Sequence, residues 1–124
     1  MKEIDAPVSV GDLLDRITIL TIKDANIKTF DASELAILQQ IADNLELPKS
    51  VLHLQQILLS VNEEIWGVED FNRECERNKK FDQDFIENAR SVYILNDTRA
   101  HIKKTINHLS NSEIVEVKSH GDYL

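Results

Sequence analysis

Apolar residues recur three and four positions apart along most of this chain, and this repeat restricts the fold more than any other feature. The longest stripe runs from Leu54 to Cys75. Such spacing keeps side chains on one face of a helix, whereas a strand alternates with a period of two. Gly and Pro occur only 3 and 2 times in 124 residues, so the turn signals of an all-β fold are scarce. The pattern predicts an all-α protein.

The first two helices each have a start signal. One is expected over about 10–28, with Ser9 as its N-cap. The next follows Asp31, which is expected to cap it, with Glu34 at the third position of a capping box. Pro48 ends this second helix or begins the next one.

The last two helices are longer. The third is expected to run from about 48 to 77, and Gly67 leaves open a kink, close helix packing or two shorter helices. The fourth is expected over about 83–109, with Asp82 as its cap. After it, residues 110–124 alternate imperfectly and predict a short extended arm.

These elements predict a single domain over residues 1–124, an antiparallel bundle of about four helices. The third and fourth helices, each about 40 Å long, exceed what two shorter helices can cover. A homodimer that buries the surplus apolar surface is therefore expected. Trp66 points away from the main apolar stripe of its helix and is the candidate interface residue.

Charge and composition restrict the partners. The formal net charge is −8 and the pI is about 4.9, which argues against nucleic acid and anionic membranes as main partners. The single cysteine, Cys75, continues an apolar stripe and fits a reducing compartment. No signal-peptide pattern and no apolar run long enough for a membrane span are present. A cytoplasmic protein without cofactor is expected.

The fourth helix carries the most informative polar residues. Asn96, Arg99 and Lys103 share one side of it, and Arg99 lies within its apolar stripe. On the third helix Glu64 occupies a comparable position. A buried carboxylate needs a cation and further hydrogen bonds, so a Glu64–Arg99 pair is predicted, and a structural ion pair is favoured over a ligand site.

The first helix could add to such a site. Asp12, Arg16 and Lys23 share one flank, although a solvated flank accounts for them as well. Should that flank face the fourth helix, a pocket for a phosphate, sugar nucleotide or dicarboxylate would form between the helices. Its candidate residues are Arg16, Glu64, Asn96, Arg99 and Lys103.

Metal and nucleophile chemistry has little support. The i, i+3 carboxylate pairs Asp12/Asp15 and Asp84/Glu87 resemble magnesium-binding pairs, but Asp15 is expected opposite the apolar face of its helix. His101 and His108 fall on an outer face, and one cysteine cannot supply a zinc motif. No metal site is predicted.

Long motifs resemble a known group of proteins. The segments "PVSVGDLLDRITILTIK" and "ARSVYILNDTRAHIKKTIN", with "EVKSHGDY" near the end, are similar to a small bacterial or phage-type family known as a domain of unknown function. The resemblance covers nearly the whole chain. It implies a context of tetratricopeptide-repeat and glycosyltransferase-like regions, and hence an association with cell-surface carbohydrate biosynthesis. It identifies no catalytic residue.

The sequence thus favours a helical binding or assembly module that acts with a protein partner. The alternative is a small enzyme or sensor for an anionic metabolite, and whether the chain is an enzyme stays open.

Overall fold

The computed structural model describes residues 3–112 and contains four α-helices. The helices are α1 (Val10–Asn26), α2 (Ser33–Asn44), α3 (Lys49–Asn78) and α4 (Gln83–Leu109). The all-helical prediction is confirmed, and the described part of the chain has no strand. None of its helices is long and apolar enough to cross a membrane. Most of the expected C-terminal arm lies outside the described residues.

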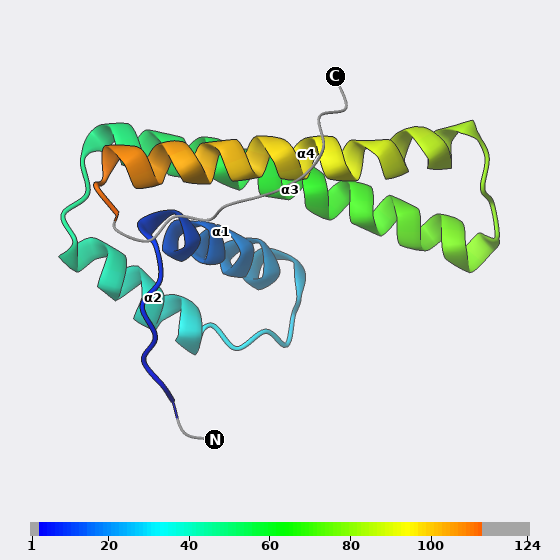
Figure 1. Cartoon of the computed structure of the whole chain (residues 1–124). Coiled ribbons are helices and arrows are strands. Elements are labelled where there is room, and N and C mark those ends of the chain that lie inside the picture. The colour runs from blue at the N-terminus through cyan, green and yellow to red at the C-terminus, as the bar shows by residue number, and fades with distance from the viewer. Residues whose placement is uncertain (1–2, 113–124) are drawn as a thin grey trace.

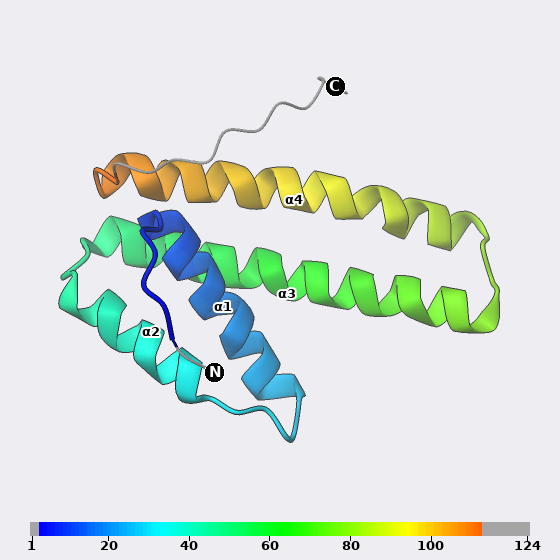
Figure 2. The ribbon, with the colours of Figure 1, turned by 60° about the horizontal axis from the view of Figure 1, so that its bottom comes forward.

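The two long helices form an antiparallel hairpin that organises the fold (Figure 1). Helix α1 packs against both α3 and α4, and α2 packs against α1. Turning the molecule shows that the closed end of the hairpin extends past α1 and α2 (Figure 2). The four helices therefore cover one another only at the end where the N-terminus of α3 meets the C-terminus of α4.

Local capping explains where the helices begin. The side chain of Ser9 accepts a hydrogen bond from the Asp12 amide, and that of Asp82 accepts one from the Phe85 amide, as predicted. Asp31 instead accepts from the Ser33 amide at 3.0 Å, and α2 begins after Ala32.

The capping box predicted for α2 is wrong. The Glu34 carboxylate lies 2.6 Å from the Arg16 guanidinium of α1 and so does not reach back to Asp31. A charged partner on the neighbouring helix competes with the backbone amide for the same carboxylate.

The hydrophobic core lies where α1 crosses the hairpin. Leu14 of α1, Leu58 and Val51 of α3, and Ile106 of α4 are almost completely excluded from solvent. The closed end of the hairpin has very little core, because Cys75 is the only buried residue within residues 63–101. Cys75 is therefore a packing residue, as its place in the apolar stripe predicts.

The two helical glycines have opposite surroundings. Helix α3 continues through Gly67, which confirms a single third helix and excludes the alternative of two shorter ones. A Cβ atom at Gly67 would meet nothing within 4 Å. At Gly11 a Cβ atom would lie 2.7 Å from the Lys103 carbonyl oxygen and 2.8 Å from the Asn107 Oδ1 atom. The Gly11 amide donates to that Oδ1 atom at 2.7 Å. Gly11 therefore permits the close approach of α1 and α4, whereas Gly67 serves no contact within the described chain.

Alanine at each glycine should change stability in opposite directions. Gly67→Ala should raise the free energy of unfolding by about 1 kcal/mol, because alanine loses less backbone entropy in a helix. Gly11→Ala should lower it by about 1–3 kcal/mol, because α1 must move away from α4. Urea denaturation of both variants and the wild type measures the two shifts. A stabilising Gly11→Ala would contradict the close packing described here.

Candidate functional site

A buried ion pair joins α1 to α4. The Asp15 side chain of α1 is 7% exposed, and Arg99 of α4 contacts both of its carboxylate oxygens. The Nε atom of Arg99 donates to Oδ1 at 2.9 Å and its Nη2 atom donates to Oδ2 at 2.5 Å. This two-point contact is the strongest ionic geometry available to a guanidinium group and a carboxylate.

Helix α3 contributes an amide to the same cluster. The Nδ2 atom of Asn62 donates to Asp15 Oδ1 at 3.0 Å and to Thr18 Oγ1 at 2.8 Å. The Thr18 hydroxyl in turn donates to the backbone carbonyl of Asp15 at 2.7 Å. Asn62 and Thr18 are both buried, so these hydrogen bonds satisfy polar atoms that solvent does not reach.

Two further residues of α4 complete the cluster. The Oδ1 atom of Asn96 accepts a hydrogen bond from Arg99 Nη1 at 3.2 Å. The Lys103 ammonium lies 2.9 Å from the Asp12 carboxylate and 3.8 Å from that of Asp15. We call these seven side chains the polar cluster: Asp12, Asp15, Thr18, Asn62, Asn96, Arg99 and Lys103. Its two cations and two carboxylates balance in formal charge.

The surroundings of Asp15 lower its pKa. Burial by itself raises the pKa of a carboxyl group, because it disfavours the charged form. Hydrogen bonds from Arg99 and Asn62, together with the charges of Arg99 and Lys103, outweigh this effect and hold the pKa of Asp15 below its ordinary value. Asp15 is therefore ionised at neutral pH and stays paired with Arg99.

The structure brings together only part of the predicted site. Asn96, Arg99 and Lys103 meet in the polar cluster. Arg16 lies elsewhere, with a side chain that is 61% exposed and paired with Glu34 of α2. Glu64 is exposed on α3 and forms no ion pair within residues 3–112, so the predicted Glu64–Arg99 pair is wrong. The first helix, which crosses the hairpin, supplies the carboxylate instead.

Four members of the cluster were not predicted as site residues: Asp12, Asp15, Thr18 and Asn62. Asp15 was expected opposite the apolar face of its helix, which is wrong because α1 lies between α2 on one side and α3 and α4 on the other. Asn62 gave a usable signal, since it follows Leu58 by four positions and precedes Ile65 by three. A polar side chain within such a stripe needs a buried partner, which Asp15 and Thr18 supply.

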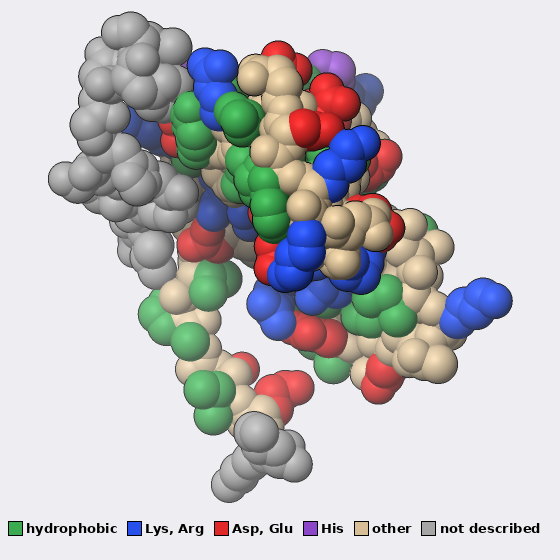
Figure 3. Space-filling model, turned by 90° about the vertical axis from the view of Figure 1, so that its right-hand side faces the viewer, with side chains coloured by type: hydrophobic (Ala, Val, Ile, Leu, Met, Phe, Trp, Pro, Cys, Tyr) green, Lys and Arg blue, Asp and Glu red, His purple; other side chains and the backbone are tan. Residues whose placement is uncertain are grey.

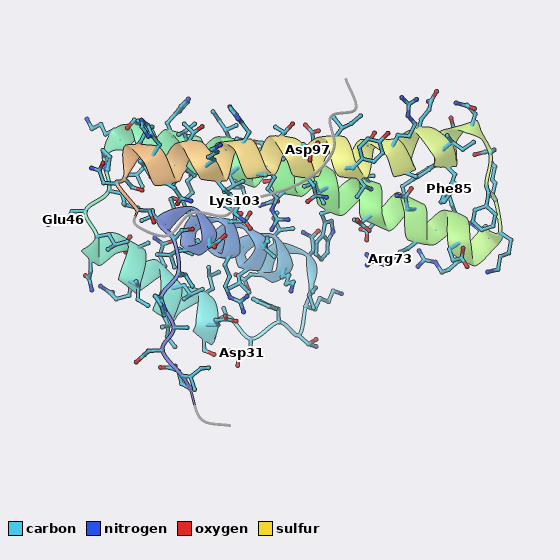
Figure 4. All side chains as sticks on the ribbon, in the orientation of Figure 1. Asp31, Glu46, Arg73, Phe85, Asp97 and Lys103 are labelled. Atoms are coloured by element: carbon cyan, nitrogen blue, oxygen red, sulfur yellow. The ribbon has the colours of Figure 1, made fainter. Side chains whose placement is uncertain are left out.

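Trp66 and Ile22 line two neighbouring hollows, of which the first is also lined by members of the polar cluster. The first has a volume of about 200 Å³, and its other lining residues are Ile19, Asn62, Ile65, Glu69, Asp70, Arg73 and Arg99. The second has a volume of about 350 Å³, and its other lining residues are Thr21, Ala25, Asn26, Leu59 and Glu63. Trp66 is partly exposed, so the only tryptophan of the chain forms a wall between two open hollows. Figure 4 shows Arg73 on the side of α3 that faces away from α4.

The described residues contain no group of three His, Cys, Asp or Glu side chains that could hold a metal ion. His101 and His108 are exposed on α4. The carboxylates of Asp12 and Asp15 face the cations of α4 and are used in ion pairs.

Comparison with known proteins identifies one relationship. A model described as a "Family of unknown function (DUF6165)" matches residues 4–123 of the chain. No curated protein and no solved structure matches it significantly.

Neutralising Asp15 should remove a pH-dependent part of the stability. Because folding lowers the pKa of Asp15, its ionised form stabilises the protein fully above about pH 4 and loses this effect as the pH falls through the folded pKa. Asp15→Asn should therefore lower the free energy of unfolding by about 3 kcal/mol at pH 7 and by less below pH 4. Denaturant unfolding between pH 3 and pH 7 measures the difference, with exposed Asp24→Asn on the same helix as control. If the free energies of unfolding of the wild type and Asp15→Asn differ by the same amount at every pH, the charge of Asp15 adds nothing to stability.

Proposed function

We propose that this chain, which belongs to the family of unknown function DUF6165, is a non-catalytic binding and assembly module that acts through the surface around Trp66. In this role the polar cluster holds the helices in place, and the two hollows receive side chains of a partner.

The state of Arg99 supports the proposal most directly. A site that binds a free anion needs a cation whose donors face the ligand. Arg99 directs its Nε and Nη2 donors to Asp15 and one Nη1 donor to Asn96. Its charge is thus compensated inside the protein, which is the arrangement of a structural ion pair.

The residues around Trp66 also support the proposal. Tryptophan and arginine are the side chains most enriched at the centres of interfaces. Here Trp66 and Arg73 line the first hollow together with Ile19, Ile22 and Ile65, and acidic residues line it as well. The combination offers a partner an aromatic anchor, apolar walls and charges for orientation.

The remaining parts of the proposal concern location and partners. We place the module in the cytoplasm, as a homodimer, with the enzymes of cell-surface carbohydrate biosynthesis as its protein partners. The carbohydrate assignment rests on the resemblance of the motifs, since the chemistry of the site does not specify a sugar. No cofactor is assigned.

Photo-crosslinking in cells that express this protein tests where the partner binds. p-Benzoylphenylalanine replaces Glu69, which lines the first hollow, or, as control, exposed His101 on α4. The proposal expects a defined adduct from position 69, none from position 101, and loss of the adduct when Trp66→Ala is added. Mass spectrometry identifies the captured protein. Equal capture at both positions, or none at either, would contradict the proposal.

The alternative is an anionic ligand, and one observation favours it: Arg99 and Arg73 both line the first hollow. A ligand that binds only the folded state raises the melting temperature. We expect no rise for the wild type with phosphate, sugar nucleotides or dicarboxylates. A rise that disappears in Arg73→Ala, which breaks no ion pair within residues 3–112, would establish the anion site and refute a purely protein-binding role.

A further inference from the structure

The closed end of the α3–α4 hairpin has an uncovered face. Helix α1 has 17 residues and α3 has 30, so α1 covers only part of the length of α3. Within residues 63–101 only Cys75 is buried. Figure 3, which faces this end, shows hydrophobic side chains at the surface between groups of opposite charge. Two paired helices without a third element bury little apolar surface, so this end of the fold lacks a packing partner.

One stripe of α3 runs along this face. Its members follow one another at spacings of four, three, four, three and four, which keeps them on one face of the helix. The hollows on both sides of Trp66 confirm that the first five lie on one side of α3. We call them the outer stripe: Leu59, Glu63, Trp66, Asp70, Arg73 and Arg77.

Charge is distributed unevenly along the outer stripe. Its two acidic members, Glu63 and Asp70, precede its two basic members, Arg73 and Arg77, along the chain. A parallel copy of the helix in register would place like charges together. An antiparallel copy, centred between positions 70 and 73, would place Asp70 of each copy opposite Arg73 of the other.

The individual pairs of that antiparallel arrangement are chemically matched. Asp70 meets Arg73 of the second copy, and Trp66 meets Arg77 of the second copy, which allows a cation–π contact. The two-fold symmetry repeats each pair, as in any contact between identical surfaces. Both pairs have the same midpoint on α3, between positions 71 and 72, so one register satisfies both of them.

The charged groups at the centre of the stripe are available for this contact. Asp70 and Arg73 are three positions apart on α3, yet no ion pair joins them, and neither has another ionic partner within residues 3–112. Glu69, one turn before Arg73, is likewise unpaired there. Arg77 is held by Glu74 through its edge, which leaves the flat face of the guanidinium for stacking.

We infer that the outer stripe of α3 is a self-association surface, on which a second copy of this chain binds antiparallel and reciprocal Asp70–Arg73 pairs fix the register. The inference rests on the proposed binding role of the Trp66 surface and names a second copy as its occupant. The two hairpins then form a central four-helix layer, with an α1–α2 unit at each end.

Charge reversal in the full-length chain tests this register. Sedimentation equilibrium should show a dimer for the wild type and at least about tenfold weaker association for Asp70→Arg or Arg73→Glu alone, because each places like charges together. The double variant D70R/R73E should dimerise again. An equimolar mixture of the two single variants should form a heterodimer, because each then supplies the charge that the other lacks.

Charge reversals at positions outside the outer stripe serve as controls. Glu64→Arg changes the same charge on α3 outside the outer stripe, and Arg90→Glu does so on α4, and both should dimerise like the wild type. Circular dichroism melts verify that every variant is folded. A monomeric wild type, single reversals that dimerise normally, or a mixture that fails to associate would each overturn the inference. Capture of a different protein at position 69 by a monomeric wild type would refute the second copy and leave the proposed function intact.

Discussion

The ion pair between Asp15 and Arg99 is the interaction on which the rest of the structure depends. It lies between α1 and α4, and Asn62 of α3 binds the same carboxylate, so one buried charge joins three helices. A buried carboxylate without its partners would be strongly unfavourable, and this requirement leaves α1 little freedom to slide or rotate on the hairpin. The bare backbone at Gly11 allows the helices to approach closely enough for these contacts.

The position of α1 determines what is covered at the two ends of the α3–α4 hairpin. At the covered end it closes the polar cluster, so the cations there are compensated by carboxylates of the same chain. Farther along, the shorter α1 ends and α3 continues for several turns, which creates the hollows beside Trp66 and exposes the outer stripe. The closed cluster and the open surface therefore follow from the same packing.

Arg99 shows what the residue pattern of a single helix can predict about a buried charge, and what it cannot. The apolar residues around Arg99 correctly indicated that it lies against the rest of the protein. The predicted partner, Glu64 of α3, is exposed, and the carboxylate that pairs with Arg99 comes from α1 instead. The apolar residues of α1 mark one face of the helix, and Asp15 lies opposite that face, which predicted an exposed side chain. Asp15 is buried because α1 is packed on more than one side.

The sequence by itself determined the local structure. Periodicity and side-chain caps at Ser9 and Asp82 specified the helices, because both signals act within a few residues of the chain. Only the tertiary structure decided which carboxylate pairs with Arg99, why Gly11 is needed while Gly67 is not, and which face of α3 stays open. These outcomes depend on the crossing of helices distant in sequence, and that crossing is set by how buried charges and apolar faces are satisfied together.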